Sequence, residues 1–355
     1  MNTKRILFVC TNLSSFVKED MTILRERNSV TVLQISSKSK VSQFFSLVRQ
    51  LIFLTFNIHR FNLVYIWFAD YHSFLPILFC HIFNKPSFVV AGGYDVCRIK
   101  KVGYGSFVNP LRGFMTKYTF THSSRCLCVS SHVERIVRAI SPGANTELVY
   151  NGISRFFTSE NTPPQDLPAR EKCGVLSVAS ASSSQGIYIK GIDRYITAAR
   201  LNPELSFTLV GCSKEVLEKH FGSEEKPGQQ GGVGGPDLLP VNLVLYPQLD
   251  QKALKELYIK SKVYCQLSRS ESFGVAMAEA MYYNCIPVYT TAGGLKEVAG
   301  EFGFMVSGKD QDEISSAIKR AHSATETPDS RERIGSLFTH EQRAERLLII
   351  IDQES

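Results

Sequence analysis

Two glutamates in the second half of the chain have the types and spacing of ligand-binding residues. The apolar run Val263–Leu267 predicts a strand, which leads through a short loop into a helix at Val275–Tyr283. Glu271 precedes this helix and Glu279 lies about two turns inside it. Alanines and methionines surround Glu279, an unfavourable setting for a carboxylate without a partner. The pair therefore predicts a binding site; the alternative is a helix-dipole acid followed by an exposed acid.

The loop before this helix has the features of a phosphate site. The free backbone N–H groups of Phe273, Gly274 and Val275 would stand at the helix N-terminus, where the helix dipole favours an anion. Gly274 has no side chain to keep a ligand away from the backbone. We therefore expect a phosphorylated ligand at this point.

A second candidate site lies in the first half of the chain. The predicted strand Ser87–Ala91 is followed by two glycines and then by Asp95. We predict a role for Asp95 near an acceptor or a reacting group; the alternative is a turn that Asp95 caps. His72 is another candidate, although a single histidine among aromatic residues is more often structural.

The elements that must position these residues alternate between strands and helices. Eleven apolar runs predict strands: Ile6–Cys10, Val30–Leu33, Leu63–Trp67, Ser87–Ala91, Cys126–Val129, Leu148–Val149, Gly174–Ala179, Phe207–Val210, Leu243–Tyr246, Val263–Leu267 and Ile286–Tyr289. Helix-like stretches lie between them, for example Val41–Asn57 and Ile192–Arg200. Such alternation is typical of parallel sheets that helices cover on both faces.

The alternation stops once, and this break divides the chain. Asn161–Pro168 contains three prolines and cannot continue a helix or a central strand. We predict a first domain at 1–160, a linker at 161–170, a second domain at 171–330 and a helical segment at 331–355 that packs back on the first domain. Two Rossmann-like, doubly wound α/β domains would then face a cleft.

Composition narrows the classes of protein. The 355 residues carry a formal charge of +7, which suits phosphorylated ligands, nucleic acid or an anionic membrane equally well. The nine cysteines include no CxxC pair and no cluster with zinc spacing, so we expect reduced core cysteines in a cytoplasmic protein without a metal site. The N-terminus reads as a strand rather than a signal peptide. We expect no segment long and apolar enough to span a membrane.

Several motifs of the second half resemble those of the glycosyltransferase family 4, the retaining GT-B enzymes also called glycosyl transferases group 1. The family pattern E-x7-E matches Glu271 and Glu279, and its G-x-P-V and G-G elements match Asn284–Val288 and Gly293-Gly294. Asn284 replaces the usual glycine, which is a mild change because Asn tolerates a left-handed conformation. Matches to the family's N-G-V/I, K-G-x-D and I-V-G motifs follow the same order, at Asn151–Ile153, Lys190–Asp193 and Leu209–Gly211.

This resemblance implies a function and a set of roles. The chain would move a sugar from a UDP- or GDP-sugar to a saccharide, lipid-linked or other hydroxyl acceptor without a metal, in cell-surface glycan biosynthesis. Glu279 would bind the ribose, Glu271 the transferred sugar and Lys190 the diphosphate. Ser272, Phe273, Gly274, Gly293 and Gly294 would complete the donor site.

The sequence departs from the family pattern at one informative place. The family has an arginine before its K-G motif, whereas Val178–Ile189 contains none. Either Arg269 or Arg98 substitutes for it, or the diphosphate is bound more weakly. This departure keeps open a degenerate GT-B binding or scaffold subunit without transferase activity. A Rossmann oxidoreductase is excluded because Cys10–Phe16 contains no glycine, and a nucleotide-sugar epimerase is a minor alternative.

The expected partners are a sugar donor and an acceptor, and no nucleic acid. The stretch Val41–Arg60 is apolar and aromatic and contains basic residues, so it can lie on the inner face of a membrane. A core helix of the first domain is the alternative.

Overall fold

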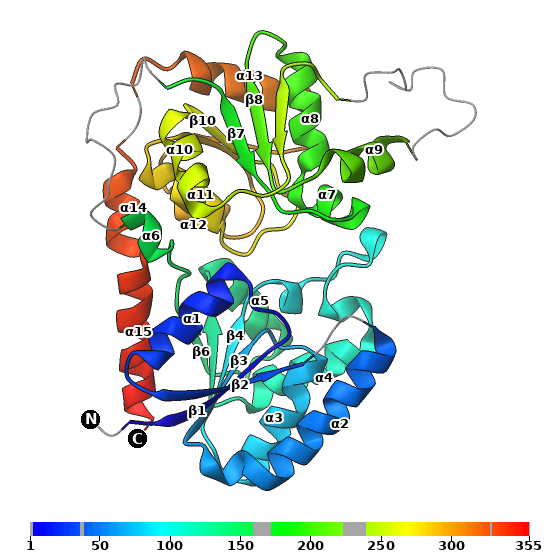
Figure 1. Ribbon diagram of the computed structural model, residues 1–355, viewed down its shortest axis with the longest axis vertical. Coiled ribbons are helices and arrows are strands. Elements are labelled where there is room, and N and C mark those ends of the chain that lie inside the picture. The colour runs from blue at the N-terminus through cyan, green and yellow to red at the C-terminus, as the bar shows by residue number, and fades with distance from the viewer. Residues whose placement is uncertain (1–2, 36–38, 159–171, 223–238, 327–328, 355) are drawn as a thin grey trace. The chain divides into compact units, whose positions relative to one another are not determined.

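The computed structural model describes residues 3–35, 39–158, 172–222, 239–326 and 329–354. The chain forms two compact units, each built on a six-stranded parallel sheet (Figure 1). The first unit comprises residues 1–152 and 340–355, and the second comprises 153–339. The predicted fold class of two doubly wound α/β domains is therefore confirmed.

The strands of the first unit follow the order β2-β1-β3-β4-β5-β6, and all pairs are parallel. Their bounds are β1 Arg5–Cys10, β2 Ser29–Gln34, β3 Leu63–Trp67, β4 Ser87–Ala91, β5 Arg125–Cys128 and β6 Thr146–Leu148. The helices of this unit are α1 Ser15–Arg25, α2 Lys40–Asn57, α3 Tyr71–Ile82, α4 Pro110–His122, α5 Ser131–Ile140 and α15 His340–Gln353, with short 3-10 turns η1 Ile58–Arg60, η2 Tyr94–Val96, η3 Lys100–Val102 and η4 Ser106–Val108.

The second unit has the strand order β12-β11-β10-β7-β8-β9, again all parallel. Its strands are β7 Val175–Val178, β8 Phe207–Val210, β9 Leu243–Tyr246, β10 Val263–Gln266, β11 Ile286–Thr290 and β12 Phe304–Val306. Its helices are α6 Arg155–Thr158, α7 Ser184–Lys190, α8 Ile192–Leu201, α9 Lys214–Gly222, α10 Gln251–Lys260, α11 Val275–Tyr282, α12 Leu295–Ala299, α13 Gln311–Ser323 and α14 Arg331–Leu337.

This strand order creates a switch point in the second sheet. The chain runs outward from β7 through β8 to β9 and then returns to β10 on the other side of β7. Loops that leave β7 and β10 therefore diverge to opposite faces of the sheet, and ligands of open α/β sheets bind in the crevice that this divergence leaves. Lys190 ends α7, the helix that follows β7, and Glu271 lies in the loop that follows β10.

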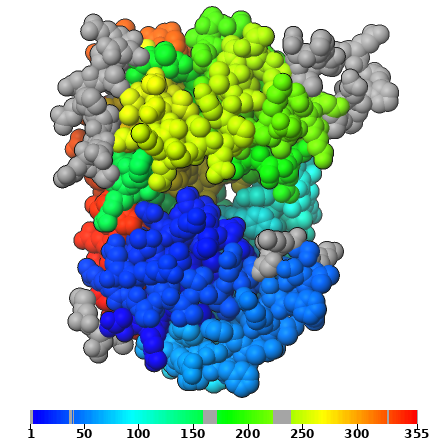
Figure 2. Space-filling model, viewed as in Figure 1, coloured from blue at the N-terminus to red at the C-terminus, as the bar shows by residue number. Residues whose placement is uncertain are grey.

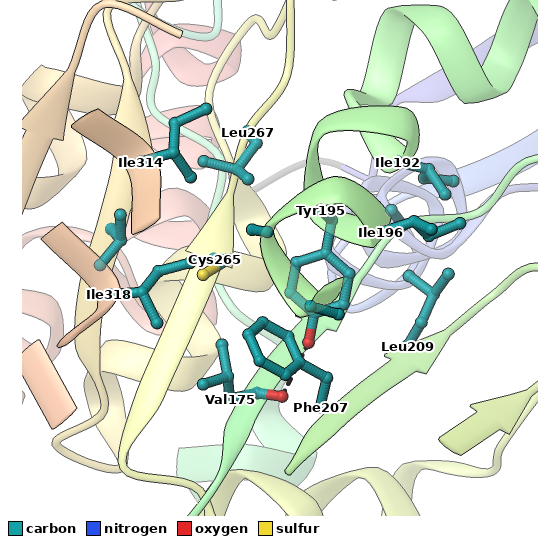
Figure 3. Packing of buried hydrophobic residues seen from close by; sticks show 14 of the residues in the cluster. Val175, Ile192, Tyr195, Ile196, Phe207, Leu209, Cys265, Leu267, Ile314 and Ile318 are labelled. Atoms are coloured by element: carbon teal, nitrogen blue, oxygen red, sulfur yellow. Dashed lines mark hydrogen bonds between the residues drawn. The ribbon is translucent and has the colours of Figure 1, made fainter. Parts of the chain in front are cut away.

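A continuous apolar core fixes these strands in place. Tyr195 of α8 packs edge-on against Phe207 of β8 and donates a hydrogen bond to the Val175 carbonyl oxygen at 2.7 Å (Figure 3). The same hydroxyl donates to the Thr208 carbonyl oxygen at 2.9 Å. Its polar atom is thereby satisfied inside the core, so a bulky ring can lie against the central strands.

The unit boundaries differ from the predicted domain boundaries. The first unit ends at residue 152 rather than 160, and α6 already belongs to the second unit. The predicted segment 331–355 is divided, because α14 belongs to the second unit whereas α15 packs on α1 of the first, as expected of a helix that packs back. The predicted linker at 161–170 lies outside the described residues.

Two predictions about apolar residues need correction. Seven of the nine cysteines are buried and all nine are free thiols, but Cys173 is exposed.

Among the described residues, Val41–Arg60 is one helical segment that is long and apolar enough to cross a membrane by length and composition, although we expected none. Only 17% of its apolar window is buried, which also contradicts the core-helix alternative.

Candidate active site

A network of polar side chains lies at the carboxyl ends of β7 and β10. The Lys190 ammonium, at the end of α7, lies 3.0 Å from Oε2 of Glu271. Their side chains are 34% and 12% exposed, so the lysine remains open to a ligand while the carboxylate is mostly covered. The structure thus brings together a cation and an acid that the sequence separates by 81 residues.

Three buried residues of β10 and its following loop hold Glu271. Gln266 donates one hydrogen bond to Oε2 of Glu271 at 3.3 Å and another to Ser268 at 3.0 Å. The hydroxyl of Tyr264 donates to the Gln266 side-chain oxygen at 3.0 Å, which fixes the direction of the amide. Glu271 is therefore held by a chain of hydrogen bonds that begins inside the sheet.

Glycines allow the backbone to close around this network. Gly293 has a φ of +60°, and a Cβ at this position would overlap the carbonyl oxygen of Glu271. Gly191 follows Lys190 with a φ of +68°, and its Cβ would overlap the Leu267 carbonyl oxygen. Both contacts require glycine, because any side chain would separate the loops that position Lys190 and Glu271.

Glu279 occupies a different environment from Glu271. Oε2 of Glu279 accepts a hydrogen bond of 2.8 Å from the hydroxyl of Tyr258, which is fully buried in α10. Burial raises the pKa of Glu279 from 4.5 to about 7, and the Tyr258 hydrogen bond lowers it by a smaller amount. The carboxyl group thus changes charge near neutral pH.

The start of α11 combines a covered aromatic side chain with a glycine in a left-handed conformation. Phe273 is 1% exposed and packs edge-on against Phe338 with ring centroids 5.3 Å apart. Gly274 precedes α11 with a φ of +103°. Ser272 is half-buried beside them, and Gly294 is the N-cap residue of α12 after the Gly293 turn. The predicted donor residues of β10–α11 and β11–α12 therefore lie at neighbouring strand ends, since β10 pairs with β11.

Arg269 does not present its charge to this network. Its guanidinium forms two hydrogen bonds of 2.7 and 2.6 Å with the carboxylate of Asp193 and a third of 2.7 Å with the Tyr188 carbonyl oxygen. It also stacks on the Tyr188 ring at 4.1 Å. Arg269 therefore ties α7 and α8 to the β10 loop, and this role argues against Arg269 as the missing diphosphate arginine. Arg98 is exposed in the first unit.

Asp95 does not have the exposure that its predicted catalytic role requires. It is fully buried, and its carboxylate accepts hydrogen bonds from the backbone N–H groups of Ala69 at 3.0 Å, Gly92 at 3.3 Å and Gly93 at 2.8 Å. Burial raises its pKa to about 6, and these amides work in the opposite direction. The geometry matches the alternative of a capped turn, in which Asp95 joins the ends of β3 and β4.

The surroundings of His72 likewise favour its structural alternative. It is 1% exposed, and its Nε2 lies 2.9 Å from the Trp67 carbonyl oxygen. Burial lowers its pKa, so the neutral ring is the stable form in this apolar setting.

Sequence reasoning missed the uncharged partners of the site. Tyr258 lies in an ordinary amphipathic helix and Gln266 in an apolar strand, so neither shows a motif of its own. A buried glutamine at the carboxyl end of a strand was the one available signal. Among the residues that the structure describes, no group of three or more His, Cys, Asp or Glu side chains has the arrangement of a metal site.

Comparison with known proteins gives a family match for the second unit. Residues 180–336 match the model of the family described as Glycosyl transferases group 1. This range contains Lys190, Glu271 and Glu279. A putative glycosyltransferase of Sulfolobus islandicus filamentous virus is 36% identical over 83 residues, which are 23% of this chain and 23% of the viral protein. The chain spans about a quarter of the length of the curated relatives it matches.

Solved structures resemble the whole chain. The sucrose-phosphate synthase of Thermosynechococcus elongatus superimposes with a TM-score of 0.75 at 15% identity, covering 99% of this chain and 98% of that one. HepE of Anabaena, solved in complex with UDP-glucose, gives a TM-score of 0.68 at 15% identity, covering 99% of this chain and all of that one. The chain therefore has the GT-B fold, as predicted.

Proposed function

We propose that this protein is a retaining glycosyltransferase that moves a sugar from a nucleotide-diphospho-sugar to a saccharide, lipid-linked or other hydroxyl acceptor. The observation that carries the proposal is the Lys190–Glu271 pair at the switch point of the second sheet, inside the segment that matches the glycosyltransferase model. The complex of HepE with UDP-glucose supports a nucleotide-sugar donor. Retention rests on the resemblance of the E-x7-E motif.

Each carboxylate has a geometry suited to sugar hydroxyls. Tyr258 occupies Oε2 of Glu279, which leaves Oε1 to accept hydrogen bonds from the ribose. Glu271 accepts hydrogen bonds from Gln266 and Ser268, which fix its position. It would also accept hydrogen bonds from hydroxyls of the transferred sugar. Fixed acceptors of this kind select a polar ligand because a mostly covered carboxylate without a hydrogen-bond partner is unfavourable.

Lys190 would bind the diphosphate. Negative charge grows on the leaving nucleoside diphosphate as its bond to the sugar breaks, and a prepositioned ammonium stabilises that charge. The backbone N–H groups at the start of α11 add to this effect. We propose that these groups act without a metal, with a UDP- or GDP-sugar as donor.

We place this activity in the cytoplasm, in the synthesis of cell-surface glycans. All nine cysteines are free thiols, which suits a reducing compartment.

A donor screen followed by a transfer assay tests the proposal. Thermal unfolding is measured with UDP-, GDP-, ADP- and CDP-sugars without metal, and a donor at about 100 times its Kd should stabilise the protein by roughly 2.7 kcal/mol. Glu279→Ala should abolish this shift, whereas Glu301→Ala, at an exposed acid of the same unit, should keep it.

Glu271→Ala and Lys190→Ala should abolish transfer while the protein stays folded. Full transfer by either variant would refute the assignment, and the anomeric configuration of the product, read by NMR, tests retention.

The alternative is a GT-B binding or scaffold subunit without transferase activity. The commitment of Arg269 to Asp193 favours it, because the diphosphate then lacks the arginine that the family pattern includes. Donor binding without transfer or hydrolysis, across a panel of saccharide and lipid-linked acceptors, would support this alternative.

A further inference from the structure

Three helices of the first unit form one continuous surface. In Figure 1, α2, α3 and α4 lie side by side in the lower part of the ribbon. The buried side chain of Gln50 in α2 donates a hydrogen bond of 2.9 Å to the His72 carbonyl oxygen of α3. Phe74 of α3 packs against Tyr118 of α4 with ring centroids 5.0 Å apart. We call this surface the α2–α4 face.

The α2–α4 face exposes an unusual amount of apolar surface. Phe44, Phe45 and Phe56 of α2 are 63%, 66% and 68% exposed. The remaining large exposed apolar side chains of the face are Val41, Val48, Leu51, Ile52, Ile82, Leu111 and Phe114. Figure 2 shows the α2 segment, in mid-blue, on the outer surface of the first unit. Large exposed apolar side chains that gather on neighbouring helices in this way are typical of surfaces that bind a protein or a membrane.

The apolar stripe follows the helical repeat of α2 but points outward. Val41, Phe44, Phe45, Val48, Ile52 and Phe56 recur at intervals of three and four residues, which places them on one side of the helix. The opposite side anchors α2 through the buried residues Gln50 and Leu54. The helix is therefore part of the folded unit, and its apolar side remains available to a partner outside it.

The charges of this region are almost all positive. Residues 27–133 contain twelve Lys and Arg residues and two acids, a formal charge of +10 against +7 for the whole chain. The two acids are Asp70 and Asp95, and both are buried. None of the three helices contains an acidic residue, whereas α1, α5 and α15 all do. Arg49, Arg60 and Lys117 are exposed on or beside the face.

We propose that the α2–α4 face docks the protein on an anionic lipid bilayer. Exposed phenylalanines and aliphatic side chains would enter the boundary between headgroups and acyl chains, while the flanking arginines and lysines contact lipid phosphates. A surface with exposed basic side chains and no exposed acidic side chains is complementary to anionic headgroups. The inference does not depend on the proposed transfer reaction, because vesicle binding is measured without a sugar donor.

Other occupants fit these observations less well. A twofold contact between two copies would place the positive face against itself, which is repulsive. The phosphates of a nucleic acid would contact the basic side chains of the face. The aliphatic side chains of α2 would then remain exposed to water. A bilayer satisfies both the apolar stripe and the charge.

Sedimentation with vesicles tests the proposal on the full-length protein. Vesicles of phosphatidylcholine with 30% phosphatidylglycerol should bind the protein, and pure phosphatidylcholine should bind it much more weakly. Phe44→Ser with Phe56→Ser should abolish binding. Arg60→Glu with Lys117→Glu should weaken it at least tenfold, given about fivefold for each basic residue near such a surface. Val241→Ser, at a residue of the second unit that is 93% exposed, should change nothing.

Three outcomes would overturn the proposal. One is absence of binding to anionic vesicles by the unaltered protein, and another is equal binding to neutral vesicles. The third is a change of oligomeric state in the phenylalanine variant, measured by analytical ultracentrifugation, with vesicle binding unchanged; the face would then be a contact between copies. Thermal unfolding confirms that each variant is folded, and a retained donor shift would separate loss of docking from loss of the donor site.

Discussion

Glu279 is a carboxyl group with a pKa near neutrality at the position where we propose that a carboxylate binds the ribose. Ribose hydroxyls would donate hydrogen bonds to the charged form, and burial raises the pKa of Glu279 to about 7. Donor affinity should therefore rise as the pH increases from 6 to 8. In Glu279→Gln we expect weak donor binding that does not change over this range. Calorimetric titration of the donor at several pH values measures both, and an equally steep pH dependence in the variant would assign the titration to another group.

The raised pKa of Glu279 also makes the folded protein less stable as the pH increases. The folded state holds the Glu279 proton up to about pH 7, whereas the unfolded chain releases it near 4.5. The stabilisation from the protonated group is thus complete below pH 4.5 and is lost as the pH rises through 7. Glu279→Gln should therefore be more stable than the unaltered protein at pH 8, by up to about 3 kcal/mol. Urea unfolding at pH 5 and pH 8 measures this difference, which should be small at pH 5.

Gly293 should be as important to the site as the charged residues. A Cβ there would overlap the Glu271 carbonyl oxygen, and φ is +60°. We expect Gly293→Ala to lose about 1–3 kcal/mol of stability and to lose donor binding as well, because the Glu271 loop must move. Gly222→Ala, in the same unit and with open space around the new methyl group, is the control. Normal donor binding by Gly293→Ala would show that the loop contact does not position Glu271.

At this scale the sequence predicted charged residues better than their partners. A charged side chain in an apolar segment is unfavourable without a partner or ligand. This is the signal that identifies Glu271, Glu279 and Lys190. Asp95 has the same signature but accepts hydrogen bonds from backbone amides after β3 and β4. Spacing does not distinguish a carboxylate that accepts backbone amides from one that faces a ligand. Tyr258 carries no charge, so its contact with Glu279 emerges only when α10 packs against α11.

At the scale of elements, the C-terminal helix shows how a remote segment completes a sheet unit. Arg343 of α15 forms two hydrogen bonds with the carboxylate of Asp20 in α1, of 2.5 and 2.8 Å. Asp20 also accepts from Tyr65 at 2.6 Å and Trp67 at 2.8 Å, and both members of the ion pair are buried. The pair fixes α15 against the first unit through fully satisfied polar groups.

Removing only the cation of this ion pair should destabilise the first unit far more than removing both charges. Arg343→Leu leaves Asp20 buried without its cation and should lower the stability of the first unit by about 3–5 kcal/mol. Arg343→Leu combined with Asp20→Asn should recover much of that loss, because no uncompensated charge remains. Urea unfolding of the two variants gives the comparison. Equal destabilisation of both would mean that packing of α15, rather than charge, dominates.

The sequence predicted the strands that form clear apolar runs and missed a short strand at the edge of a sheet. Strands such as Leu63–Trp67 are buried on both faces and read as unbroken apolar runs. The edge strand β12 has only three residues, between glycines, and gives no such run. Helical periodicity places the apolar residues of α2 on one side, but it does not say whether that side meets the sheet or the solvent. The exposed stripe could therefore be seen only in the folded unit.

At the scale of the whole molecule, the proposed chemistry is divided unequally between the units. Lys190, Glu271, Glu279 and the two glycine turns all belong to the second unit, whereas the basic, apolar α2–α4 face belongs to the first. The family model also covers only the second unit, at residues 180–336. We expect such a division when one unit binds a common donor and the other adapts to a particular acceptor or surface.

This division predicts where a donor will act when no acceptor is present. Hydrogen exchange should slow at the backbone N–H groups of Phe273–Val275 and Gly293–Leu295, because the donor would cover both loops of the second unit. The N–H groups of η2, beside Asp95 in the first unit, should exchange at an unchanged rate. Lys190→Ala should remove the protection at 273–275, whereas Lys252→Ala, at an exposed lysine of the same unit, should not. Protection confined to the first unit would place the donor there and would contradict the assignment of Glu271 and Glu279, since a ligand slows exchange most where it binds and stabilises the fold.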